Sequence, residues 1–173
     1  MLADSCPWPL HEQNWYVAYT CSRHEKYVAK QCEERDIAAF LPMYAVQRCW
    51  RRRRAEVLLP LFPSYVFVRM ALAERFRLLA LPGFVSLVSF KGVPAVVPDI
   101  QIEPLRKAVA LGRAEPWVYL ESGKHVRVTA GPLIGLEGIV HELKNKIHVV
   151  VSFDCMNRSV LISLDATEVE ALR

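Results

Sequence analysis

The chain has 173 residues, of which 53% are hydrophobic, and its formal net charge is +4. Enough apolar residues are present to bury a core, which argues against a disordered chain. No run reaches the roughly 20 apolar residues that a membrane helix needs, and residues 1–13 lack the basic and apolar blocks of a secretory signal. We therefore expect a soluble, cytoplasmic protein with no membrane partner.

The first predicted elements are a strand and a helix. Residues 15–20 are rich in aromatic and β-branched side chains, which is typical of a strand. Ser22 and Glu25 form a capping-box pattern, which predicts a helix that runs to about residue 36. Two of its residues lie four apart and should face the core, namely Val28 and Cys32.

The remainder of the first 112 residues continues this alternation. Further strands are expected at 39–50 (interrupted near Pro42), 58–68, 84–90 and 95–97. Further helices are expected at 70–80, with Leu72, Phe76 and Leu79 on one face, and from Asp99 to about Gly112. The order is β-α-β-β-α-β plus a trailing helix. This order predicts an α+β fold, with helices on one face of a mainly antiparallel sheet.

The composition changes in the last third of the chain. Residues 113–122 contain a proline and no clear period, so we interpret them as a linker between two domains, 14–112 and 123–173. After the linker, short apolar strands are separated by glycine turns, as in the alternating segment 124–129. About 50 residues with this pattern predict a small β-barrel.

Positive charge is concentrated at one place. Residues 1–112 hold 15 Lys/Arg and 10 Asp/Glu, whereas residues 113–173 hold 7 and 8. Most of the excess comes from one run, Arg48, Arg51, Arg52, Arg53 and Arg54, with Trp50 among them. Arginine can bind a phosphate through bidentate hydrogen bonds, and tryptophan can stack on a base, so the run indicates contact with nucleic acid. The alternative is a solvated loop without a ligand.

No pattern of catalytic or metal-binding residues is found. The five cysteines include no C-x-x-C pair, and the five histidines include no H-E-x-x-H. G-x-S-x-G and phosphate-binding loop motifs are absent as well. The sequence therefore predicts no enzyme, no metal, no cofactor and no disulfide framework.

Two sets of motifs resemble the NusG family of bacterial transcription factors over residues 14–172. Those similar to the NusG N-terminal domain are Trp15-Tyr16-Val17, Glu25-Lys26, the run 61–68 (LFPSYVFV) and Pro82-Gly83-Phe84-Val85. The segment 123–132 (GKHVRVTAGP), continuing through Leu136-Glu137-Gly138, is similar to a KOW motif. The resemblance implies a ferredoxin-like N-terminal domain and an SH3-like KOW barrel.

The resemblance also implies partners and contact residues. The N-terminal domain should dock on the clamp helices of the largest RNA polymerase subunit and reach the second-largest subunit, as a monomer. Its apolar pocket would be formed by Trp15, Phe62, Tyr65 and Phe84, which composition alone explains equally well as core residues. The arginine run would face DNA near the upstream fork. Partner contacts of the KOW domain, with Rho or a small-subunit ribosomal protein, would involve Leu133, Leu136, Phe153 and Arg158.

The sequence also departs from the commonest family pattern. Ser64 stands where the family usually has glycine, and Leu133 and Leu136 replace aromatics that touch partners in other members. These departures favour a specialised paralogue of the RfaH, UpxY and LoaP kind, which antiterminates particular operons and promotes processive elongation. Two alternatives stay open: a housekeeping NusG that couples transcription to Rho or the ribosome, and a KOW-type ribosome- or RNA-binding protein.

Overall fold

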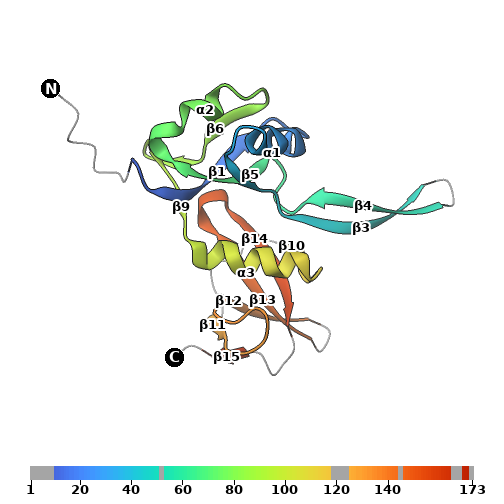
Figure 1. Ribbon diagram of the computed structural model, residues 1–173. Coiled ribbons are helices and arrows are strands. Elements are labelled where there is room, and N and C mark those ends of the chain that lie inside the picture. Colours follow the sequence, from blue (N-terminus) through green and yellow to red (C-terminus); the bar gives the residue numbers. More distant parts are fainter. Residues whose placement is uncertain (1–9, 51–52, 118–124, 144–145, 165–168, 172–173) are drawn as a thin grey trace. The chain divides into compact units, whose positions relative to one another are not determined.

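The computed structural model describes residues 10–50, 53–117, 125–143, 146–164 and 169–171 (Figure 1). The chain forms two compact units. The first unit comprises Met1–Leu41 and Pro63–Pro98, and the second unit comprises Pro42–Phe62 and Asp99–Arg173. This division differs from the one expected at the predicted linker, because residues 42–62 and the helix after Pro98 group with the C-terminal part.

The first unit is an antiparallel sheet with helices, in the strand order β2-β5-β1-β6, and β9 also pairs with β1. Its strands are β1 (Gln13–Thr20), β2 (Ala38–Phe40), β5 (Tyr65–Ala71), β6 (Phe84–Leu87), β7 (Ser89–Phe90), β8 (Val93–Pro94) and β9 (Val96–Val97). Its helices are α1 (Glu25–Glu33), the 3-10 turn η1 (Leu72–Glu74) and α2 (Phe76–Leu79). The predicted α+β class is confirmed for this part.

One face of this sheet packs against the helices and forms a core. Strands β1 and β5 contribute alternate residues, including Tyr16, Ala18, Val66 and Val68. The helices contribute Val28, Ala29, Cys32, Leu72 and Leu78. The prediction that Val28 and Cys32 face the core is confirmed. The continuous helix at 70–80 was wrong: β5 extends to Ala71 and only short turns follow, so that Phe76 and Leu79 are exposed and Leu78 is buried.

The predicted capping box of α1 is absent. The helix begins at Glu25, and no side chain caps the position before it, His24. Glu25 does not reach back to Ser22, because its carboxylate is buried and accepts a hydrogen bond from the backbone N–H of Ser64. The partner of Glu25 is thus Ser64, which is distant in the sequence, and not the neighbouring Ser22 that the spacing suggested.

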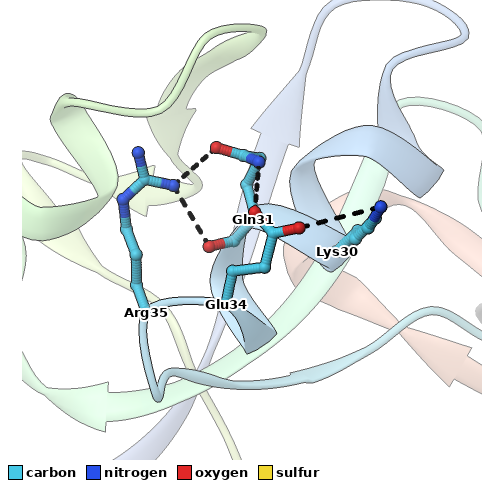
Figure 2. Close-up of polar contacts among 4 residues, drawn as sticks. All are labelled: Lys30, Gln31, Glu34 and Arg35. Carbon is cyan, nitrogen blue, oxygen red and sulfur yellow. Dashed lines mark hydrogen bonds and ion pairs between the residues drawn. The ribbon is translucent and has the colours of Figure 1, made fainter.

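The C-terminal end of α1 is held by a chain of polar contacts (Figure 2). The Arg35 guanidinium donates to the side-chain oxygen of Gln31 at 2.6 Å and to its backbone oxygen at 3.2 Å. Gln31 donates to Glu34 at 2.6 Å, and Lys30 lies 3.7 Å from the same carboxylate. Arg77 of α2 donates to the backbone oxygen of Arg35. The turn that follows α1 is therefore tied to α2.

The second unit contains a two-stranded ribbon, a helix and a six-stranded antiparallel sheet. The ribbon is β3 (Met43–Trp50) with β4 (Arg53–Pro60), and the helix is α3 (Asp99–Ala110). The sheet has the order β10-β14-β13-β12-β11-β15. Its strands are β10 (Ala114–Trp117), β11 (His125–Val128), β12 (Glu137–Leu143), β13 (Lys146–Phe153), β14 (Arg158–Leu164) and β15 (Val169–Ala171), with a 3-10 turn η2 (Asp154–Met156).

Two expectations for the second unit differ from what is observed. Ala114–Trp117, within the predicted linker, forms strand β10 and pairs with β14, while residues 118–122 lie outside the described part of the chain. No pairing closes the sheet between β10 and β15 among the described residues. The closed barrel therefore stays a prediction, whereas the alternation of buried Val126 and Val128 with exposed Arg127 is confirmed.

Candidate functional site

The sheet of the first unit has a second face, opposite α1, that gathers aromatic residues. Side chains alternate along a strand, so Trp15, Val17 and Tyr19 of β1 share this face while Tyr16 and Ala18 enter the α1 core. The strand register places Tyr65 opposite Tyr19 and Phe67 opposite Val17. The face is buried at its centre and accessible at the Tyr19–Tyr65 end.

Tyr19 and Tyr65 form an aromatic pair at the accessible end of this face. Their ring centroids are 5.5 Å apart with an interplanar angle of 48°, and Tyr19 is 41% exposed. Two of the predicted pocket residues, Trp15 and Tyr65, thus lie on one face, but Trp15 is buried. Sequence reasoning missed Tyr19, although the alternation of residues 15, 17 and 19 carried the signal.

The other two predicted pocket aromatics lie elsewhere. Phe84 pairs with Thr20 across a register shift and packs against the α1 core, away from the face of Tyr65. Phe62 belongs to the second unit, where it is 1% exposed and makes an edge-to-face contact with Phe153, with centroids 5.3 Å apart. The structure therefore does not assemble the four aromatics into one exposed pocket.

The backbone that leads into Tyr65 is fixed by two hydrogen bonds. The N–H of Ser64 donates to Oε1 of Glu25 at 2.7 Å, and its carbonyl accepts from the N–H of Thr20 at 2.8 Å. Ser64 has a φ of 69°, in the left-handed region that favours glycine. Glycine would adopt this conformation with less strain than serine does. The buried carboxylate of Glu25 holds the turn in place despite the serine.

The ribbon β3–β4 carries the predicted nucleic-acid residues. Arg48 pairs with Ala55 and Arg54 pairs with Cys49, and both arginines are exposed. Because consecutive pairs alternate in direction, these two arginines occupy opposite faces of the ribbon. Trp50 pairs with Arg53 at the end of the strands, while Arg51 and Arg52 lie outside the described residues. The described arginines of the predicted run, Arg48, Arg53 and Arg54, thus lie in the last three pairs of the ribbon.

Three of the predicted KOW contact residues are core residues of the second unit. Leu133, Leu136 and Phe153 are buried, whereas Arg158 is exposed. The same turn presents Ile134 to solvent, which sequence reasoning missed. Gly138 faces a close neighbour, since a Cβ there would meet Val149 Cγ1 at 2.6 Å. Ile134 and Arg158 are thus exposed groups of this region, beside Pro132, Asp154 and Asn157.

The described part of the chain has two exposed cysteines, Cys21 and Cys49, and two that are wholly or partly buried, Cys32 and Cys155. It contains no group of three or more His, Cys, Asp or Glu residues placed to hold a metal ion. Burial raises the pKa of the Cys32 thiol to about 11 and raises the pKa of Cys155, which keeps both thiols protonated and unreactive at neutral pH. None of the described helices is long and apolar enough to cross a membrane.

Comparisons with known proteins agree on one family. The family model described as transcription termination factor nusG matches residues 13–106. The transcription termination/antitermination protein NusG of Rickettsia bellii is 24% identical over 91% of this chain and 90% of its own. The transcription termination/antitermination protein NusG of Pseudomonas aeruginosa is 28% identical to this chain, over 91% of this chain and 98% of its own length.

A solved structure supports the fold. The chain of Thermotoga maritima NusG superposes with a TM-score of 0.55 at 23% identity, covering 94% of this chain and 98% of the other. The strand pattern, the Ser64 turn at a position that favours glycine, and the family match over more than half of the residues agree. This chain belongs to the NusG family of transcription factors.

Proposed function

We propose that this protein is a non-enzymatic transcription elongation factor that binds RNA polymerase in the cytoplasm and promotes processive elongation. The observation that carries the proposal is the Tyr19–Tyr65 pair, an accessible aromatic contact on a NusG-family sheet. Aromatic side chains with a polar tip are favoured at protein interfaces because they bury large area with few rotatable bonds. The expected partner is the tip of the clamp helices in the largest subunit.

The ribbon supplies a second contact, with DNA near the upstream fork. Arg48 and Arg54 are exposed on opposite faces of β3–β4, so a nucleic acid that meets the end of the ribbon can be contacted from both. The last described pair of the ribbon is Trp50 with Arg53, which adds one aromatic and one basic residue at the same end. Contact with phosphates positions a protein without reading sequence, which suits a factor that travels along a template.

The finer role is antitermination at selected operons by a specialised paralogue. Its support is that Ile134 is exposed in the C-terminal turn while Leu133 and Leu136 are buried, and that none of the described residues 129–137 is an exposed aromatic that could contact a partner. The proposal keeps an N-terminal polymerase-binding domain at 14–112 and a C-terminal domain at 123–173. The housekeeping alternative would use the same polymerase contact but would also bind Rho or the ribosome.

Transcription in vitro through a terminator, with and without the protein and Rho, tests the proposal. A specialised antiterminator should raise read-through, and added Rho should not convert it into a termination factor. Enhanced Rho-dependent termination would favour the housekeeping role. A Tyr65→Ala variant that stays folded should lose binding to core polymerase by about 30-fold, as for a hot-spot aromatic. Capture of ribosomal proteins without polymerase would contradict the proposal altogether.

A further inference from the structure

Strand β10 covers one edge of β14 in the sheet of the second unit, and among the described strands it pairs with β14 alone (Figure 1). The N–H of Ser163 donates to the carbonyl of Arg113 at 3.0 Å. Hydrogen-bonded pairs alternate along an antiparallel ladder, so the next two such pairs in the register are formed by Glu115 and Trp117. The odd-numbered residues of β14 therefore direct their N–H and C=O groups toward β10.

Strand β10 is the more weakly held of the two neighbours of β14. It has only four residues, of which Ala114 is buried, whereas Glu115 and Pro116 are exposed. Pro116 lies in a pair without ladder hydrogen bonds, so its nitrogen faces away from β14 and offers no donor to a further strand. On its other side, β14 pairs with β13 over its whole length. Loss of β10 would therefore uncover one edge of β14 and leave the other edge paired.

The central residues of β14 have the same chemical types in both directions from Leu161. Val160 and Ile162 flank it, and Ser159 and Ser163 come next on the two sides. Two such strands, antiparallel and centred on Leu161, would set valine opposite isoleucine and serine opposite serine. Cross-strand pairs of β-branched side chains and of hydroxyls are favourable. The free edge of β14 is thus complementary to itself.

The hydrogen-bonding pattern agrees with this self-complementarity. In the arrangement centred on Leu161, Ser159 of one copy lies opposite Ser163 of the other, so odd-numbered residues meet odd-numbered residues. These are the residues whose N–H and C=O groups β10 now covers. Each group would therefore exchange a partner in β10 for an equivalent partner in the second copy, and none would be left without a hydrogen bond.

We propose that the edge of β14 is a binding site for β14 of a second copy of this chain, and that β10 covers it. The two copies then form a two-fold interface in which both use the same strand. While residues 114–117 pair with β14, the chain is a monomer, and their release joins two sheets into one. This inference concerns strands that the proposed polymerase contact does not use, so it stands or falls separately from that function.

The molar mass of the full-length chain, measured by light scattering after size-exclusion chromatography at a series of concentrations, tests the inference. The wild type should be monomeric. Glu115→Pro removes an N–H that donates to β14, so its molar mass should double as the concentration rises. Glu115→Ala is the matched control, because it removes the same side chain but keeps the N–H, and it should stay monomeric. An excess of a synthetic peptide with the sequence of residues 112–117 (GRAEPW) should return Glu115→Pro to the monomer.

Amide hydrogen exchange locates the interface. In the dimer, residues 114–117 should lose protection while residues 159–163 keep it. Trp117→Gly loosens β10 without a proline and should shift the equilibrium in the same direction, which covers the case in which Glu115→Pro does not fold.

Three results would overturn the inference. The first is that both variants stay monomeric although residues 114–117 exchange freely. The second is that these residues stay protected in both variants, which would show that β10 is not released. The third is a dimer in which residues 159–163 lose protection, because the copies would then meet at another surface.

Discussion

Replacing Glu25 with Ala should destabilise the protein through a turn that lies 39 residues away in the sequence. The substitution removes the acceptor for the Ser64 N–H, a bond of 2.7 Å to a carboxylate that is 6% exposed. Hydrogen bonds to charged groups contribute about 1.5–3 kcal/mol, so the free energy of unfolding should fall by about 2 kcal/mol. Glu25→Gln retains a neutral acceptor and should lose roughly half as much.

Chemical denaturation monitored by tryptophan fluorescence measures this loss. Glu33→Ala is the matched control, because that carboxylate is exposed on the same helix, and its effect should stay within about 0.5 kcal/mol. Ser64→Gly relieves the strain of the left-handed backbone, which stabilises the folded state by about 1–2 kcal/mol. The greater backbone freedom of glycine also stabilises the unfolded state, by about 0.4–1 kcal/mol. The substitution should therefore be stabilising by up to about 1.6 kcal/mol. Equal stability of Glu25→Ala and Glu33→Ala would refute the role of this bond.

Three further predictions concern other parts of the chain. Because burial raises the pKa of Cys32 from 9.0 to about 11, its contribution to stability should be constant well below pH 9 and fall by about 2 kcal/mol as the pH rises to 11. In denaturation measured at a series of pH values, Cys32→Ala should lack this fall. Parallel plots of stability against pH for the wild type and the variant would contradict the role of Cys32. Changing Arg48 and Arg54 to Ser should flatten the salt dependence of binding to a DNA-containing elongation complex by about 0.9 per phosphate contact; an unchanged slope excludes both contacts. Gly138→Ala should lower the free energy of unfolding, measured by denaturation, by about 2 kcal/mol or more, because its Cβ would overlap Val149 and Val150. Unchanged stability would show that the neighbouring strand can move to make room for the Cβ without a cost.

The sequence predicted those parts of the fold that depend on local periodicity. Val126 and Val128 alternate with polar residues, and Val28 and Cys32 recur at helical spacing, and both patterns survive in the structure. The prediction of a helix over residues 70–80 was wrong. Leu72, Phe76 and Leu79 fit a helical period, but the strand pairing of β5 extends to Ala71. Tertiary pairing overrode a local preference there.

The candidate site was harder to predict because it depends on which strands lie side by side. Trp15 and Tyr65 lie on one face of the sheet, but Phe84 follows a register shift next to Thr20 and packs against the α1 core. Register shifts leave no mark in composition or period. The exposure of Tyr19 and the contact of Phe62 with Phe153 likewise arise from pairings distant in the sequence.

The contact of Arg77 with the Arg35 carbonyl has a consequence for local opening of the first unit. Helix α2 spans only Phe76–Leu79, and a single turn is too short to be stable in water by itself. Its order therefore derives from neighbours, among them the turn that follows α1. The amides of α2 and of the α1 C-terminus should exchange with solvent as one cooperative group. Fraying of α1 beyond Lys30 would then release the two most exposed apolar side chains of α2, Phe76 and Leu79, from any fixed orientation.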